Sequence, residues 1–163
     1  MSRVQEDSRL AYSKRVGERV EGTLIQMIDP LRYVPDTEAE HYDARTEALL
    51  TPSADLPFVG ICVLEAGTKV EIKSTGVVYG KAQRRGRFKL RKPQHEELLA
   101  TGGVYLFAVC APNDDRDVIA AKIIPATLVD ELEFSWVTND RGAPDTQLAW
   151  SQLFDVTEIE GSR

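Results

Sequence analysis

The spacing of apolar residues divides the first half of the chain into predicted helices and strands. Residues 8–28 carry apolar side chains at roughly helical intervals, which predicts a helix that the pair Asp29–Pro30 ends or bends. Residues 57–64 form an apolar run typical of a strand buried on both faces, and residues 68–74 alternate apolar and polar positions. A tight turn at 65–67 would join these two strands as a hairpin.

The second half alternates between the same two patterns. We expect a helix from Pro93 to Gly102–Gly103, apolar strands at 104–110 and 118–125, and short helices at 125–134 and 145–154. The less regular stretch 30–55 is interpreted as loops with a short strand or helix, and the basic stretch 76–92 is interpreted as a loop. Helices that alternate with strands in this way predict an α/β fold, with a central mixed β-sheet flanked by α-helices.

Charge is distributed unevenly along the 163 residues, whose formal net charge is −6. Residues 69–92 hold nine Lys or Arg side chains and one acid, whereas the rest of the chain holds 25 acidic and 11 basic residues. A basic segment in an acidic chain indicates a surface for phosphate groups, and the alternative is a solvated surface loop. The candidate nucleic-acid contacts are Lys81, Arg84, Arg85, Arg87, Lys89, Arg91 and Lys92.

Composition excludes several other classes of protein. No apolar run reaches the 18 residues of a membrane span, and the N-terminal segment lacks the apolar core of a secretion signal. Cys62 and Cys110 lie inside apolar runs, which favours two buried thiols over a zinc site. We therefore expect an intracellular, cytoplasmic protein that does not contact membranes.

Glu71 and Lys73 are the first candidates for catalytic chemistry. They lie two residues apart in the alternating strand, so their side chains share one face. A carboxylate beside an ammonium can hold a hard cation and orient a water molecule for phosphodiester cleavage. Asp55, at the start of the preceding strand, would supply a second carboxylate if the two strands pair. The alternative is an exposed ion pair on an amphipathic strand.

Four segments, taken in order, resemble a known family. They are "KRVGERVEGTLIQMI" (14–28), Asp55 with its apolar strand, "VEIKS" (70–74) and "RKPQHEELLATGGVYLFAVC" (91–110). This order resembles the PD-(D/E)XK nuclease superfamily, which has a restriction-endonuclease-like fold. Within that superfamily it looks most like the archaeal Holliday junction resolvases. The resemblance covers residues 14–124.

The resemblance implies a role for each matching position. Asp55, Glu71 and the backbone carbonyl of Ile72 would hold Mg²⁺ or Mn²⁺. Lys73 would polarise the attacking water and help to neutralise the transition state. Glu21, from the first helix, would reach the shell around the metal, and Gln94 would lie at the start of the helix that follows the basic segment.

The chain departs from the family pattern at the first carboxylate. No proline directly precedes Asp55, because Pro52 lies three residues earlier. Asp43 is a rival for the role of Asp55, and Glu65 is a weaker rival because it lies at the predicted turn. His95, next to Gln94, is a candidate base or phosphate contact, with a partly exposed helix histidine as the alternative.

Together these features predict one nuclease-like domain over residues 1–163, with a core at 14–124 and an extension at 125–163. The expected activity is metal-dependent endonucleolytic cleavage of branched or duplex DNA by a homodimer, in the manner of a Holliday junction resolvase. A restriction-type or repair-type nuclease is one alternative. A non-catalytic nucleic-acid-binding module on the same fold is another, and a plain interaction domain is the third.

Overall fold

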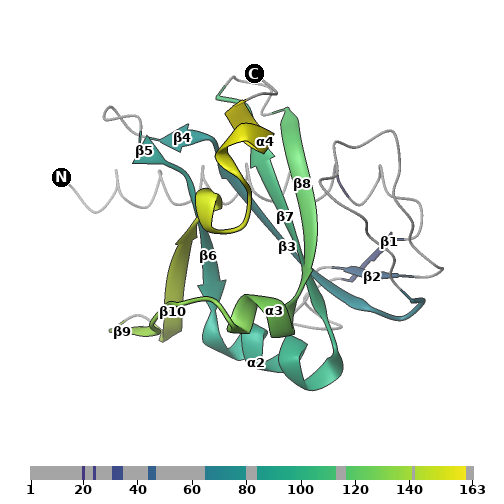
Figure 1. The fold of residues 1–163 in the computed structure, drawn as a ribbon. Coiled ribbons are helices and arrows are strands. Elements are labelled where there is room, and N and C mark those ends of the chain that lie inside the picture. Colours follow the sequence, from purple (N-terminus) through teal and green to yellow (C-terminus); the bar gives the residue numbers. More distant parts are fainter. Residues whose placement is uncertain are drawn as a thin grey trace, which may run out of the picture.

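A computed structural model describes residues 20, 24, 31–34, 44–46, 65–79, 84–112, 117–140 and 142–160. Within these ranges the chain forms ten strands, three α-helices and one 3-10 helix (Figure 1). The strands are β1 (Leu31–Tyr33), β2 (Ala44–Thr46), β3 (Lys69–Gly76), β4 (Val78–Tyr79), β5 (Arg84–Arg85), β6 (Arg87–Arg91), β7 (Val104–Cys110), β8 (Val118–Pro125), β9 (Val137–Asn139) and β10 (Gly142–Ala149). The helices are α2 (Lys92–Thr101), α3 (Ala126–Asp130), η1 (Trp150–Gln152) and α4 (Val156–Glu160).

The main sheet is mixed, which confirms the predicted fold class. Its five strands run in the order β1-β2-β3-β7-β8, with β3 and β7 parallel and the other neighbours antiparallel. A second sheet has the order β6-β10-β9, and β4 pairs with β5. Helices α2 and α3 lie at one end of the main sheet and α4 lies at the other end (Figure 1). The predicted strands at 104–110 and 118–125 and the helix beginning near Pro93 are confirmed.

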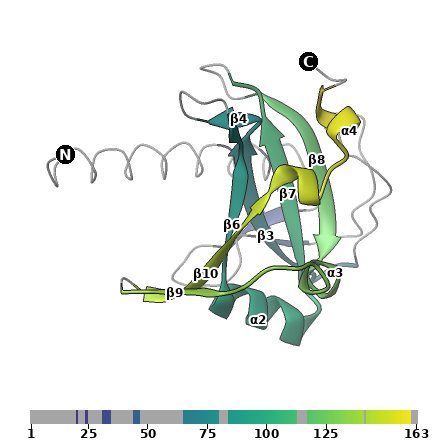
Figure 2. The same cartoon turned by 60° about the vertical axis from the view of Figure 1, so that its left-hand side comes forward.

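Strand β7 is the centre of the core, since all seven of its residues are buried. On one face, Tyr105 and Phe107 pack with residues of the second sheet, and the rings of Phe88 and Phe107 have centroids 4.8 Å apart. On the other face, Leu106 and Ala108 pack against a cluster that includes Leu24. Figure 2 shows β6 and β10 running beside β3 and β7, as this packing requires. A strand buried on both faces has no polar alternation, which explains its continuous apolar sequence.

Two glycines set the ends of the elements that carry the candidate site. Gly67 has a φ of 87° in the turn before β3, where the Thr68 hydroxyl donates to the Glu65 carbonyl at 2.7 Å. Gly102 has a φ of 68° and ends α2, with its N–H donating to the Leu98 carbonyl. Residues other than glycine rarely adopt these left-handed backbone conformations, so glycine is favoured at both positions. The predicted turn and the predicted helix end are confirmed.

The loop predicted at 76–92 and the helix predicted at 145–154 are wrong. Within the first range, β6 is a strand whose exposed basic residues alternate with buried Phe88 and Leu90. Its partner β10 buries Thr146 and Leu148 in the same alternating way. The many basic residues of β6 make its strand alternation of buried and exposed positions hard to recognise in the sequence. The short apolar run after Asp145 has a spacing that also fits a helix.

Two other predicted elements fall partly or wholly outside the described ranges. Val20 and Leu24 are helical and buried, as the helix at 8–28 requires, but its other residues lie outside the described part of the chain. The strand at 57–64, including Cys62, also lies outside it. Cys110 is buried, as expected. No helix among the described residues is long and apolar enough to span a membrane.

The start of β6 is held very close to the end of β3. The Gly86 N–H donates to the Val77 carbonyl at 3.1 Å, and the Gly86 carbonyl accepts from the Trp150 N–H at 3.1 Å. The Trp150 indole N–H also donates to the Val77 carbonyl, at 2.8 Å. A Cβ at position 86 would overlap the Gly76 carbonyl oxygen and the Thr75 hydroxyl. Gly86 is therefore a buried packing residue.

We expect Gly86→Ala to lower the free energy of unfolding by roughly 1–3 kcal/mol, because the methyl group meets backbone that cannot rotate away. Urea denaturation followed by circular dichroism would measure the change. Ala143→Ser, at an exposed position of β10, is the control and should stay within about 0.5 kcal/mol of wild type. Equal stabilities for wild type and Gly86→Ala would contradict the close packing of β3 and β6.

Candidate functional site

Glu71 and Lys73 project from the same face of β3 and form an ion pair. The distance from Lys73 Nζ to Glu71 Oε1 is 3.0 Å. The side chains are 5% exposed for Glu71 and 16% for Lys73, so this is not the solvated surface pair of the alternative interpretation. The expected convergence of the two side chains agrees with this distance, while their catalytic roles remain predictions.

Gln94 joins this pair from the first turn of α2. Lys73 Nζ donates a hydrogen bond to Gln94 Oε1 at 3.1 Å, across 21 positions of sequence. The helix begins directly after β6, where Pro93 suits the first turn because its fixed φ is already helical. One turn further along α2, Glu97 pairs with Lys69 at 3.3 Å and so holds the helix against the start of β3. We call Glu71, Lys73 and Gln94 the Glu–Lys–Gln cluster.

The electrostatics of the cluster favour a charged carboxylate inside the protein. Removing a carboxylate from water costs several kcal/mol unless a counter-ion and hydrogen bonds compensate. Lys73 supplies that positive charge at hydrogen-bond distance from Glu71 Oε1, and Oε2 is also buried. An ammonium has three N–H donors, and two of them point at Glu71 and Gln94 among the described residues. The third remains for a water molecule or a phosphate oxygen.

The described residues of the cluster offer the kind of oxygen ligands that a hard divalent cation prefers, but fewer of them than such a cation needs. The carboxylate of Glu71 and the backbone carbonyl of Ile72 are oxygen donors, which Mg²⁺ and Mn²⁺ prefer. Within the described ranges, no three His, Cys, Asp or Glu side chains gather to form a metal site. Asp55, Glu21 and the rival Asp43 all lie outside those ranges.

The other rival carboxylate, Glu65, lies in the turn before β3. Glu65 is exposed, and its carbonyl accepts from the Thr68 N–H at 3.3 Å, so the chain turns between these two residues. Three extended residues, at about 3.3 Å each, then separate Thr68 from Glu71. The role of Glu65 as an alternative carboxylate remains a prediction.

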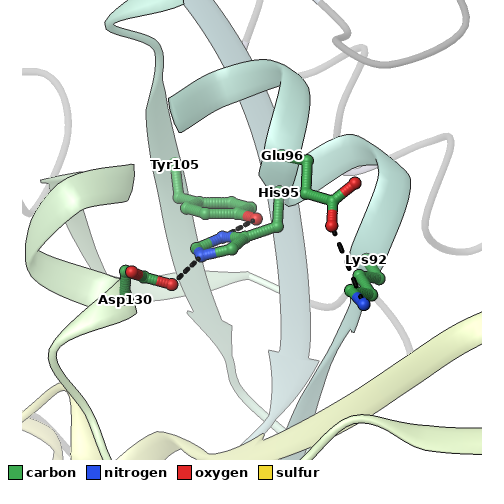
Figure 3. Close-up of polar contacts among 5 residues, drawn as sticks. All are labelled: Lys92, His95, Glu96, Tyr105 and Asp130. Atoms are coloured by element: carbon green, nitrogen blue, oxygen red, sulfur yellow. Dashed lines mark hydrogen bonds and ion pairs between the residues drawn. The ribbon is translucent and has the colours of Figure 1, made fainter. Parts of the chain in front are cut away.

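Next to Gln94 in α2 is a buried histidine, His95, with a hydrogen-bond partner at each ring nitrogen. His95 is 1% exposed. Its Nδ1 lies 2.9 Å from the Tyr105 hydroxyl and its Nε2 lies 2.9 Å from Asp130 Oδ1 (Figure 3). The rings of Phe134 and Trp136 pack against it. His95 is thus neither a partly exposed helix residue nor a group open to a substrate phosphate, and both interpretations of it from the sequence are wrong.

Tyr105 connects this histidine to β3. In the parallel pairing of β3 and β7, Tyr105 is the direct neighbour of Glu71, so both side chains lie on one sheet face. Burial, and then the negative charges of Glu71 and Asp130, raise the pKa of the Tyr105 hydroxyl above its ordinary range. Neither Tyr105 nor Asp130 is among the residues predicted from the sequence. A tyrosine inside an apolar strand was the available signal, because buried tyrosine hydroxyls usually have a hydrogen-bond partner.

The raised pKa of Tyr105 predicts a loss of stability in alkali. The folded protein keeps this proton at pH values where the unfolded chain, with an ordinary pKa near 10, releases it. Stability from this group is therefore complete below pH ~10 and falls above it, by about 1.4 kcal/mol per pH unit. Tyr105→Phe should remove this part of the slope in urea denaturation above pH ~10. Tyr33→Phe, which removes the same hydroxyl from an exposed ring, should keep the wild-type slope, and equal slopes in all three proteins would contradict the prediction.

The predicted basic contacts occupy an exposed strand rather than a loop. Arg87, Lys89 and Arg91 alternate with buried residues, so they line the outer face of β6. We call these three residues the basic row. Lys89 pairs with Asp145 of β10 at 3.3 Å, and no described residue forms an ion pair with the other two. Alternate residues of a strand are spaced by about 7 Å.

The remaining predicted contacts lie around the basic row. Arg84 and Arg85 are exposed in β5, and the Arg85 guanidinium lies over the Trp150 ring at 5.3 Å from its centroid. Lys92, in the first turn of α2, lies 3.8 Å from Glu96. Lys81 is outside the described residues. The row ends at Arg91, three positions before Gln94 in the first turn of α2.

Comparison with known proteins adds one finding. A family model described as a PD-(D/E)XK nuclease superfamily domain matches residues 7–155. The matched stretch contains the whole cluster and continues past residue 124, where the resemblance seen in the sequence ended. No curated protein and no solved structure matches the chain significantly.

Proposed function

Because this chain belongs to the PD-(D/E)XK nuclease superfamily, we propose that it is a metal-dependent endonuclease that hydrolyses DNA phosphodiester bonds. The observation that carries the proposal is the Glu–Lys–Gln cluster. A buried carboxylate and an ammonium lie 3.0 Å apart on one strand, and a second element holds the ammonium in place. Such preorganised charge, in a chain that also carries an exposed basic strand, suits cleavage of a phosphodiester.

Each residue has a defined part in the proposed reaction. Glu71, Asp55 and the carbonyl of Ile72 would hold Mg²⁺ or Mn²⁺, with Glu21 close to them. The ion, when bound, supplies a polarised water and neutralises charge on the phosphate. Lys73 directs its remaining N–H toward the attacking water or the phosphate and stabilises negative charge as it develops. Gln94 fixes the direction of the Lys73 ammonium through the 3.1 Å hydrogen bond.

Replacement of Glu71 tests the catalytic part of the proposal. Glu71→Gln keeps the size of the side chain but removes the charge, so we expect cleavage to fall by at least roughly 10²–10³-fold while DNA binding persists. Labelled four-way junction, flap, duplex and single-stranded DNA would be incubated with Mg²⁺, Mn²⁺ or EDTA, and binding would be measured by fluorescence anisotropy. Preferred cutting of the junction is the expected result for wild type.

The matched control is Glu96→Gln, the same change at a side chain on α2 that is 63% exposed, and it should cut like wild type. Binding without cutting under every metal would contradict the enzyme proposal and favour a non-catalytic binding module. Preferred cutting of plain duplex would replace the junction-directed subclass with a restriction-type or repair-type nuclease. Absence of both binding and cutting would favour an interaction domain.

DNA binding is assigned to the basic row because its charges are exposed and evenly spaced on a paired strand. Contacts from Lys and Arg to phosphates position the DNA without reading its sequence. They also release counter-ions, so affinity falls as salt rises. Asp145 reduces the net charge of the row through its ion pair with Lys89.

We expect Arg87→Ala and Arg91→Ala each to weaken binding to every DNA sequence and to reduce the slope of log affinity against log salt by about one. Asp145→Asn should act in the opposite direction and strengthen binding. Anisotropy titrations between low and moderate salt would measure both effects. Salt slopes unchanged by either arginine substitution would contradict the assignment of the row.

The proposal has three further parts, which are a homodimer, a single domain and a cytoplasmic location. Cutting both strands of a junction commonly uses two copies of a site, so we propose a homodimer. A single domain would span residues 1–163, since the C-terminal residues Trp150 and Phe154 share the core of Phe107. A nuclease that acts on cellular DNA would work in the cytoplasm.

A further inference from the structure

His95 occupies a position from which it can control the catalytic cluster without touching it. It follows Gln94 in the first turn of α2, and neighbouring helix residues point about 100° apart around the axis. Gln94 therefore reaches Lys73 on β3 while His95 reaches Tyr105 on β7. Glu71 and Tyr105 are direct neighbours in the pairing of β3 with β7. The first turn of α2 is therefore hydrogen-bonded to both strands at the site.

The hydrogen-bond donors in this arrangement follow from the chemistry of the groups. The Asp130 carboxylate can only accept, so His95 Nε2 carries the proton in their 2.9 Å contact. In a neutral imidazole the other nitrogen is then an acceptor, and the Tyr105 hydroxyl donates to Nδ1. Burial and two nearby carboxylates keep Tyr105 protonated, as this direction requires. With a neutral ring, the chain Asp130–His95–Tyr105 therefore has one consistent set of donors (Figure 3).

Among the described residues, Gln94 and His95 join the first turn of α2 to other elements, and the Glu97–Lys69 ion pair lies one turn further along the helix. His95 and Leu98 are the fully buried residues of α2, and the residue before the helix, Arg91, makes no side-chain capping hydrogen bond. The position of the first turn therefore depends on the polar contacts of Gln94 and His95. That turn carries Gln94, the partner of the Lys73 ammonium.

We infer that Tyr105, His95 and Asp130 are positioning residues that fix Gln94 and, through it, Lys73. The inference rests on the proposed function for its kinetic consequences. It also makes Asp130, which is 53% exposed and lies at the end of α3, a surface residue linked to the catalytic strand. Loss of the chain should let the first turn of α2 shift and should misdirect the ammonium.

The kinetic test uses Tyr105→Phe, which removes one hydroxyl, and Asp130→Ala, whose surface position favours folding. Each should lower kcat for DNA cleavage by roughly 10–100-fold, the usual effect of losing a supporting hydrogen bond at such a site, with KM unchanged. Asp130→Asn keeps an acceptor oxygen for His95 and should restore most of the activity. Tyr33→Phe is the matched control and should cut like wild type.

A double-mutant cycle separates positioning from a merely structural role. In a Gln94→Ala background, Tyr105→Phe should lower kcat no further, because the chain acts through Gln94. The same loss in both backgrounds, or no loss in either, would overturn the inference.

Nuclear magnetic resonance gives a readout that does not need cleavage. The ¹⁵N shifts of His95 should show a proton on Nε2, and the Gln94 side-chain amide signals should shift or broaden in Tyr105→Phe and Asp130→Ala but not in Tyr33→Phe. A ring protonated at Nδ1 alone, or Gln94 signals unchanged in both variants, would overturn the inference. A protein that cuts no DNA but shows the expected signals would instead contradict the proposed function and leave the positioning chain supported.

Discussion

The charge of one buried carboxylate constrains the rest of the site. Glu71 is almost fully buried on a sheet face that is otherwise packed with aromatic and aliphatic side chains, where an uncompensated charge would be very costly. Lys73 offsets that cost from two residues away, because side chains of a strand repeat every second position. The ammonium must itself be held in one direction, and Gln94 does this from a different element.

The surrounding fold keeps Glu71, Lys73 and Gln94 at fixed positions relative to one another. The parallel pairing of β3 with β7 places Tyr105 beside Glu71, and the length of α2 is limited by Pro93 at its start and Gly102 at its end. Close contact at Gly86 brings β6 against β3, so the basic row leads into the turn that carries Gln94. A shift in any one of these contacts would move the ammonium relative to the carboxylate.

The sequence was sufficient for the parts of the fold whose signals are local. The apolar run of β7 and the glycine that ends α2 were recognisable from composition and spacing, and Glu71 and Lys73 follow from a period of two. Strand β10 was misjudged because its alternation becomes meaningful only beside β6, which is more than 50 positions away. The same holds for Asp130, which meets His95 across 35 positions. Pairing between distant segments, which leaves no local pattern, accounts for what could not be predicted.

Metal binding by Glu71 and the Ile72 carbonyl, as proposed, can be tested by adding Mn²⁺ to the isotope-labelled protein and recording paramagnetic broadening by nuclear magnetic resonance. If these two groups hold the ion, broadening will appear first at the backbone amides of Ile72 and Lys73 and at the Gln94 side chain, and Glu71→Gln will abolish this selectivity. Broadening confined to the acidic surface, or unchanged by Glu71→Gln, would exclude a metal site at Glu71 and reduce the Glu71–Lys73 pair to a packing interaction.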